Sequence, residues 1–373
     1  MALTTLPTAA FATGSVGTSQ LANGAVTTEK LVADVNFRNL IINGDMSIDQ
    51  RNSGSSITPT NGQYGVDRWQ NAVNVSSKYS IQQVSDAPTG FVYSNKVTSL
   101  SAYSIGAGEL AGLRQYVEGY NITKLDWGTS DAQTVTLSFW VKSSLTGDFG
   151  VTVGNDNGRT YGALYNISSA DTWEKKSVTI EGDTSGTWLT TNGKGISLVF
   201  ALSTGSAFLA TADSWNASTS YGVTGQTQIL ATNSATWQVT GVQLEADTSA
   251  SDFEFLPYDV NLERCLRYYE LVASGLNVYF TNCHYYNSSY IRTVYTYRKI
   301  MRTTPSLDIV SGTDFYSFIR NNGADNFDDF TLGAGSNKVG LLLNTTDVSG
   351  TGGDAGDVLT NNASAYIAFD AEL

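Results

Sequence analysis

The chain has 373 residues, of which 41% are hydrophobic, 11% are aromatic and only 15% are charged. Disordered chains and coiled coils need far more charged or helix-forming residues, so this composition excludes both classes. The formal net charge of −13 repels phosphate backbones and argues against nucleic acid as a partner.

The cysteine and histidine counts restrict the chemistry further. Two cysteines, Cys265 and Cys283, are too few for a disulfide scaffold or a cysteine-rich zinc site. The single histidine, His284, excludes a histidine-based metal cluster. Residues 1–35 lack a basic region followed by an apolar run, and no stretch of about 18 apolar residues occurs anywhere. We therefore expect neither a signal peptide nor insertion into a membrane.

Residues 1–36 consist mainly of small and hydroxyl-bearing side chains, too few of them large enough to bury a core. Two similar stretches, GSVGTSQL and GAVTTEKL, follow one another here, and larger apolar residues recur about every five positions: Val16, Leu21, Val26 and Leu31. One interpretation is a flexible terminus. We favour an extended arm that becomes ordered by intertwining with identical arms or by docking on another protein, because a pure linker would not need this regular spacing.

Residues 37–259 carry repeated signals for β-strands. In residues 134–142, alternate hydrophobic side chains share one face of the predicted strand: Val135, Leu137, Phe139 and Val141. Residues 195–202 repeat this alternation, and residues 175–181 do so more weakly. Turns rich in Gly and Asn separate the runs, with no long helical pattern between them. This organisation predicts an antiparallel β-sandwich of the jelly-roll type.

Residues 260–373 begin with the one clear helical pattern. Apolar residues at i, i+4, i+7 and i+11 predict a helix over residues 260–273, capped by Asp259 and ended by Gly275. Strand-like segments follow at residues 277–281, 289–297, 306–310, 338–343 and 365–372. We therefore expect a linking helix and a smaller β-rich domain, so that the fold class is mainly β.

Seven ordered stretches resemble a family of phage tail-fibre and other virion-associated proteins. They are FRNLIINGDMSIDQRNSG (37–54), YGVDRW (64–69), LRQYVEGYNI (113–122), TLSFWVKSSLTGDF (136–149), TWEKKSVTIEGDTSGTW (172–188), VTGVQLEADTSASDFEF (239–255) and LERCLRYYE (262–270). Residues 297–309 also resemble the last domain of such proteins. The resemblance implies a structural protein on the virion exterior, on the tail or the capsid. It further implies a middle domain similar to carbohydrate-binding jelly rolls and assembly as a homotrimer.

Two tryptophans are candidate sugar-binding residues. Trp140 and Trp173 fall on the polar phases of their strands, where an indole can stack on a sugar ring while neighbouring hydroxyl and amide groups bind its hydroxyls. The alternative is that a neighbouring subunit, a loop or the second sheet covers these rings. Trp188, Trp215 and Tyr221 lie in polar loops and are further candidates, with local loop packing as the alternative.

Oxygen-rich loops raise the question of calcium. The segment GNDNG at residues 154–158, together with Glu181 and Asp183, supplies oxygen ligands of the kind that calcium prefers. Asn and Asp beside Gly are also ordinary turn residues, and the spacing of an EF-hand loop is absent. We therefore predict turns here, and no cofactor.

The leading hypothesis is a trimeric tail fibre that recognises host surface polysaccharide and has no enzymatic activity. Weak sugar contacts would gain strength from being repeated in one particle. One alternative is a head fibre, capsid decoration or tail adaptor protein with a purely structural role. A second is a glycan depolymerase, but nothing pairs the candidate acids Asp126, Asp131, Asp156, Glu181 and Asp183, and no nucleophile motif accompanies His284.

Overall fold

The computed structural model describes residues 37–321 and 323–373, and residues 39–373 form one compact unit. The predicted arm over residues 1–36 lies outside the described residues. The predicted domain boundaries after residues 36 and 259 stay predictions. No described helix has the length and apolar character needed to cross a bilayer.

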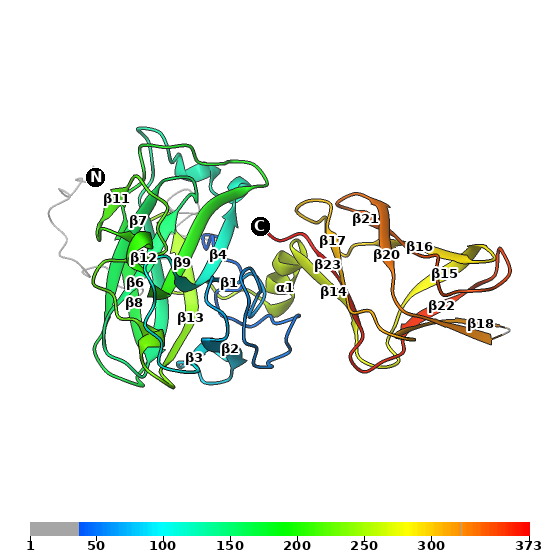
Figure 1. Cartoon of the computed structure of the whole chain (residues 1–373). Helices are drawn as coiled ribbons and strands as arrows, with labels where there is room; N and C mark the ends of the chain where they lie inside the picture. Colours follow the sequence, from blue (N-terminus) through cyan, green and yellow to red (C-terminus); the bar gives the residue numbers. More distant parts are fainter. Residues whose placement is uncertain (1–36, 322) are drawn as a thin grey trace, which may run out of the picture. The chain divides into compact units, whose positions relative to one another are not determined.

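Two antiparallel sheets make up the first part of this unit (Figure 1). The six-stranded sheet has the order β1 (Gln70–Val73), β4 (Leu110–Glu118), β9 (Lys194–Thr204), β6 (Gly147–Gly154), β7 (Thr160–Ile167) and β11 (Ser214–Asn216). The five-stranded sheet has the order β2 (Tyr79–Val84), β3 (Ser94–Ser99), β13 (Thr236–Glu245), β5 (Val135–Ser143) and β8 (Glu174–Ile180). Most neighbouring strands are distant in sequence, as in jelly rolls, and the predicted β-sandwich is confirmed.

One hydrophobic core takes side chains from both sheets. The predicted alternation in β5 is confirmed, because its four inward side chains are fully buried: Val135, Leu137, Phe139 and Val141. Strand β9 supplies Phe200, whose ring centroid lies 4.9 Å from that of Phe139. The outer face of β9 is buried as well.

Short elements connect the strands of the two sheets. Strand β10 (Leu209–Ala210) pairs in parallel with β12 (Gly222–Val223). The 3₁₀ segments are η4 (Gly119–Asn121), η5 (Thr123–Leu125), η6 (Ser206–Phe208) and η7 (Ile229–Ala231).

Helix α1 spans Tyr258–Leu266, so the predicted helix over residues 260–273 is too long. Pro257, rather than Asp259, occupies the N-cap position, and Asp259 lies in the first turn. The second half of the predicted helix is instead β14 (Tyr269–Ser274), and Gly275 follows this strand with φ +93°. Pairing of β14 with β23 satisfies the backbone here, so tertiary structure overrides the local helical pattern.

The remaining strands form two more sheets around a second core. The three-stranded sheet has the order β14, β23 (Tyr366–Asp370) and β17 (Ser306–Ile309). The seven-stranded sheet has the order β19 (Gly323–Phe327), β18 (Tyr316–Arg320), β22 (Ala355–Thr360), β15 (Tyr279–Asn287), β16 (Tyr290–Thr296), β21 (Val339–Asn344) and β20 (Thr331–Gly335). The five predicted C-terminal strands all have counterparts here, whereas β18, β19, β20 and β22 were not predicted.

Candidate functional site

The outer face of the five-stranded sheet brings Trp140 and Trp173 close together. Trp140 lies on β5, opposite Lys175 of β8 and Thr240 of β13. Trp173 directly precedes β8 and lies level with Lys142, because Glu174 pairs with Val141 in the register of the two strands. Both indoles are half-buried, so each keeps part of its ring open to solvent.

A polar network lies beside these rings and centres on Asp86. The carboxylate of Asp86 accepts a hydrogen bond from the ammonium of Lys142. It also accepts bonds from the indole N–H of Trp173, at 3.3 Å, and from Nε2 of Gln238, at 3.2 Å. Partial burial acts to raise the pKa of Asp86, but the bonds from Lys142, Gln238 and Trp173 outweigh it and hold the pKa below its usual value. Asp86 is therefore an ionised acceptor at neutral pH.

Three phenylalanines, which the sequence analysis did not single out, extend this aromatic surface. A register shift in β13 after Thr240 gives Gly241 a φ of +61°, and this residue lies against both Trp140 and Phe91. The ring of Phe91 packs on Phe253 and Phe255, with centroids 5.1 Å and 4.9 Å away. The side chain of Phe255 is 56% exposed. Its signal in the sequence is the FEF triplet at residues 253–255, which lies shortly before α1.

Trp188 and Trp215 lie together in a separate cluster with Trp127. The centroids of the Trp127 and Trp188 rings are 4.6 Å apart, and the ring of Trp215 packs on both. All three indole N–H groups donate to backbone carbonyls of the chain: Gln133, Ser185 and Glu181. Trp188 is buried in a loop, as the loop-packing alternative predicts, whereas the prediction that Trp215 lies in a loop is wrong, because it lies on β11 and pairs with Tyr161 of β7.

Tyr221 lies apart from both groups of tryptophans. Its ring packs on Phe208 with a centroid distance of 5.8 Å. Burial, followed by the negative charge of Asp156, raises the pKa of the Tyr221 hydroxyl. The structure thus divides the five predicted site residues into one pair on the sheet, one pair in a packed cluster and one separate tyrosine.

The loops considered for calcium are tied down by the chain itself. Oδ1 of Asn155 accepts from the backbone N–H of Asn157 and Arg159, at 2.8 Å and 3.1 Å, as in an Asx turn. Asp156 accepts a hydrogen bond of 2.5 Å from Tyr116, and Asp183 is paired with Arg159. Among the residues that the structure describes, no group of three or more His, Cys, Asp or Glu side chains is placed to hold a metal ion.

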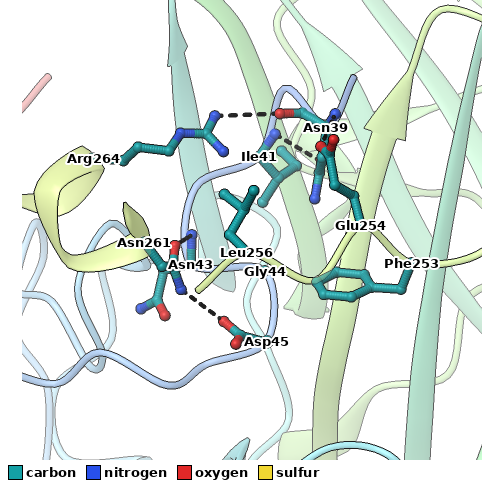
Figure 2. Close-up of a pocket in the computed structure, with 10 residues that line it drawn as sticks. All are labelled: Asn39, Ile41, Asn43, Gly44, Asp45, Phe253, Glu254, Leu256, Asn261 and Arg264. Carbon is teal, nitrogen blue, oxygen red and sulfur yellow. Dashed lines mark hydrogen bonds between the residues drawn. The ribbon is translucent and has the colours of Figure 1, made fainter. Parts of the chain in front are cut away.

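Several stretches that carry the family resemblance meet around a small pocket (Figure 2). Asn39 donates through Nδ2 to the carbonyl of Val242, at 3.1 Å, and its backbone N–H donates to Glu254, at 3.0 Å. Arg264 of α1 donates to the carbonyl of Asn39, at 3.3 Å. The pocket measures about 10 Å³, close to the minimum for one water molecule. It is too small for a ligand.

Asn43 extends this joint to two further stretches. The indole N–H of Trp69 donates to the carbonyl of Asn43, at 3.0 Å, and Nδ2 of Asn43 donates to the carbonyl of Asp67, at 2.9 Å. The neighbouring Ile42 donates its N–H to Gln115, at 2.8 Å. Five of the seven stretches therefore meet here, those at residues 37–54, 64–69, 113–122, 239–255 and 262–270. These hydrogen bonds connect five segments of the fold at one place, which we call the joint. The residues of these stretches that meet here hold the fold together and do not form a binding site.

The comparisons with known proteins concern the fold. No family model matches the sequence, and the search of curated proteins found no match. Among solved structures, the enzymatically active domain of bacteriophage CBA120 tailspike protein 4 is 13% identical with a TM-score of 0.31, and the match covers 56% of this chain and 22% of that one. The CBM22-1 xylan-binding domain of Paenibacillus barcinonensis Xyn10C is 11% identical with a TM-score of 0.28, over 54% of this chain and 99% of that one. A putative sugar-binding protein from Bacteroides thetaiotaomicron is 15% identical with a TM-score of 0.34, over 56% of this chain and 100% of that one.

Proposed function

We propose that the chain binds carbohydrate on the outer face of the five-stranded sheet, through Trp140 and Trp173. The observation that carries the proposal is the placement of two half-exposed indoles beside the Asp86 network, one on β5 and one directly before the adjacent β8. Strand spacing and rise put their backbones about 8 Å apart. One oligosaccharide can therefore contact both rings.

Each part of this surface matches a part of a sugar. The C–H face of a pyranose packs on an indole, and its hydroxyls need donors and acceptors around the ring. Asp86 supplies an ionised acceptor and Lys142 supplies donors, whereas the buried Gln238 holds Asp86 in place. The site has few fixed polar groups and is only partly enclosed, so we expect weak binding by one copy and stronger binding by several copies held together.

The proposal is for binding without hydrolysis. A glycosidase needs a carboxylic acid whose pKa is raised, so that it can protonate the leaving oxygen. Asp86, the acid beside the two indoles, has a lowered pKa and is paired with Lys142.

We further propose that the protein belongs to the exterior of a phage virion, as a homotrimeric tail fibre that contacts host surface polysaccharide. The support for this part is the ordered set of sequence stretches that resembles such proteins. The proposed docking of residues 1–36 on other virion proteins has the same support.

A subunit interface on the same surface is the second candidate function. The observation in its favour is the cluster of Phe91, Phe253 and Phe255 beside Trp140, because an exposed aromatic patch is typical of contacts between proteins. In that case the role of the chain would be structural, and a sister copy would cover the indoles.

The test compares glycan binding and oligomeric state in the same variants. Trp140→Ala, Trp173→Ala and the double variant would be measured against wild type on a glycan array and by titration calorimetry. Tyr120→Ala is the matched control, because Tyr120 is an exposed aromatic that follows β4 of the other sheet. We expect a loss of at least tenfold in affinity for the double variant and no change for the control. Unchanged glycan binding by the double variant would refute the proposal, and dissociation of the oligomer by these substitutions would favour the subunit interface.

A further inference from the structure

A cleft of about 590 Å³ lies apart from the sheet face described above. One wall comes from residues 50–53 and 62–64, and the other comes from the three-stranded sheet β14–β23–β17. Its volume falls within the range of about 300–1,000 Å³ that is usual for small-molecule sites.

Strand alternation places two acids and two tyrosines on one face of the three-stranded sheet. In β23, Tyr366 and Asp370 line the cleft, whereas the intervening Ile367 and Phe369 are buried in the second hydrophobic core. Tyr269 of β14 lies directly opposite Asp370 in the register of the two strands. Ser306 of β17 also pairs with Asp370, so Asp308 lies two residues along on the same face.

Asp308 is held in place by the two tyrosine hydroxyls. Tyr366 donates to Oδ1 of Asp308 at 2.9 Å, and Tyr269 donates to Oδ2 at 3.2 Å. Burial and the Asp308 carboxylate raise the pKa of Tyr366 to about 12, so this hydroxyl stays protonated and keeps donating. Each carboxylate oxygen has a further lone pair. Asp308 can therefore accept a hydrogen bond from a ligand in the cleft.

Arg51 lines the cleft with its charge already compensated. Its guanidinium lies over the rings of Tyr269 and Tyr64, with the central carbon 3.6 Å and 4.4 Å from their centroids. It is also paired with Asp370 and Glu372, each at 3.3 Å. Nη1 is buried and makes no hydrogen bond within the part of the chain that the structure describes, although Asp67 lies 3.6 Å away. Arg51 is therefore neutralised by acids of the chain itself, and its buried Nη1 is not open to a ligand in the cleft.

The charge balance of the cleft decides the class of ligand. Arg51 is outnumbered by Asp308 and Asp370 among the charged groups that line it. A phosphate, sulfate or uronate would meet this negative excess, whereas a neutral ligand with several hydroxyls would give hydrogen-bond donors to Asp308. We propose that this cleft is a second saccharide site, specific for neutral sugars, in which hydrogen bonds rather than indole stacking dominate binding.

The experiment must separate this site from the surface around Trp140. The probes are an array of neutral and uronate-containing oligosaccharides and, separately, inorganic phosphate, tested on the full chain. The background is the Trp140→Ala, Trp173→Ala double variant, in which the sheet surface is disabled. We expect this background to retain binding to neutral sugars and to lose at least tenfold in affinity on adding Asp308→Ala. Adding Tyr366→Phe, which removes one hydroxyl but keeps the ring, should give a smaller loss.

Asp131→Ala in the same background is the matched control, because Asp131 is an exposed acid in a loop of the sandwich. Thermal melting checks that every variant is folded. If Asp308→Ala unfolds the chain, the Tyr366→Phe result decides. The proposal is overturned if the background binds no neutral sugar, if neither cleft variant weakens that binding, or if phosphate or uronates bind better than neutral sugars. Neutral-sugar binding that depends on Asp308 but not on the two tryptophans would support this site while refuting the one proposed on the sheet.

Discussion

Arg267 donates hydrogen bonds to both carboxylate oxygens of Glu118, through Nε at 2.8 Å and through Nη2 at 2.6 Å. Tyr268 donates a third bond to this carboxylate, at 2.7 Å. Glu118 is the last residue of β4, and Arg267 directly follows α1. These bonds therefore fasten the six-stranded sheet to the segment that leads into β14.

The Glu118 contacts predict a stability that depends on pH. Burial acts to raise the pKa of Glu118, but the bonds from Arg267 and Tyr268 outweigh it and hold the pKa below its ordinary value of 4.5. Such a group stabilises the folded state above its unfolded pKa, and this contribution is lost as pH falls through the lower folded value. We expect Glu118→Gln to reduce the free energy of unfolding by up to about 3 kcal/mol at pH 7 and by much less at pH 3.

Urea unfolding at the two pH values checks this prediction. Glu263→Gln is the matched control, since Glu263 forms an exposed pair with Lys299 and should cost less than about 1 kcal/mol. Equal losses for Glu118→Gln at both pH values would show that the ion pair is not the cause.

The hydrogen bonds of Asn261, a residue of the joint in Figure 2, lead us to predict that its substitution reduces stability. Its Nδ2 donates to Asp45 and to Ser47, both at 3.0 Å, and its Oδ1 accepts from the N–H of Asn43 at 3.3 Å. Because Asn261 is buried, Asn261→Ala leaves these groups without their partner. We expect the free energy of unfolding to fall by about 1–3 kcal/mol in urea titrations. The exposed Asn157→Ala should change it by less than about 0.5 kcal/mol, and a similar loss for both variants would contradict the role of the joint.

The sequence was sufficient to predict those parts of the fold that local patterns determine. In β5, the alternation of Val135 to Val141 is visible because one face of the strand is fully buried and the other is not. The end of α1 was not predictable in this way, because residues 269–274 are fixed by pairing with β23, about 100 positions later. Strand β19, with the sequence GADNF, has almost no intrinsic β-propensity and forms by pairing with β18.

In the candidate site, too, local sequence patterns predict some features and only the tertiary fold determines the others. The alternation in the sequence places Trp140 and Trp173 on polar phases, but it carries no information about their proximity or about Asp86, which reaches Lys142 from 56 positions away. Trp188 and Trp215 resembled exposed loop residues, since their neighbours are polar. The structure packs them against Trp127 from another loop, a contact that only the tertiary fold creates.

The close packing around Gly241 leads us to predict that a side chain at this position would both strain the backbone and weaken glycan binding. A Cβ atom at this position would lie 2.6 Å from Cζ of Phe91 and 3.1 Å from Cδ1 of Trp140, and φ is +61°. We expect Gly241→Ala to cost about 1–3 kcal/mol of stability and to displace the Trp140 ring, which weakens glycan binding. Gly225→Ala is the control, because Gly225 has φ +93° but its nearest neighbour lies 4.0 Å from the Cβ position. Melting curves and glycan titrations should show strain in both variants but weaker binding only in Gly241→Ala, so equal binding by the two would contradict the link.

We expect Trp188→Ala and Trp173→Ala to have opposite effects, the first on stability and the second on glycan affinity. Trp188 is buried against Trp127 and Trp215, so Trp188→Ala removes a packed ring and should cost about 3–5 kcal/mol in urea unfolding. Trp173 is half-exposed, and we expect Trp173→Ala to cost less than about 1.5 kcal/mol while it reduces glycan affinity. At temperatures where Trp188→Ala is folded, its glycan affinity should equal that of wild type, because none of the contacts of the tryptophan cluster involves the Asp86 network. A fall in affinity for folded Trp188→Ala, with stability intact, would move the binding site to the loops.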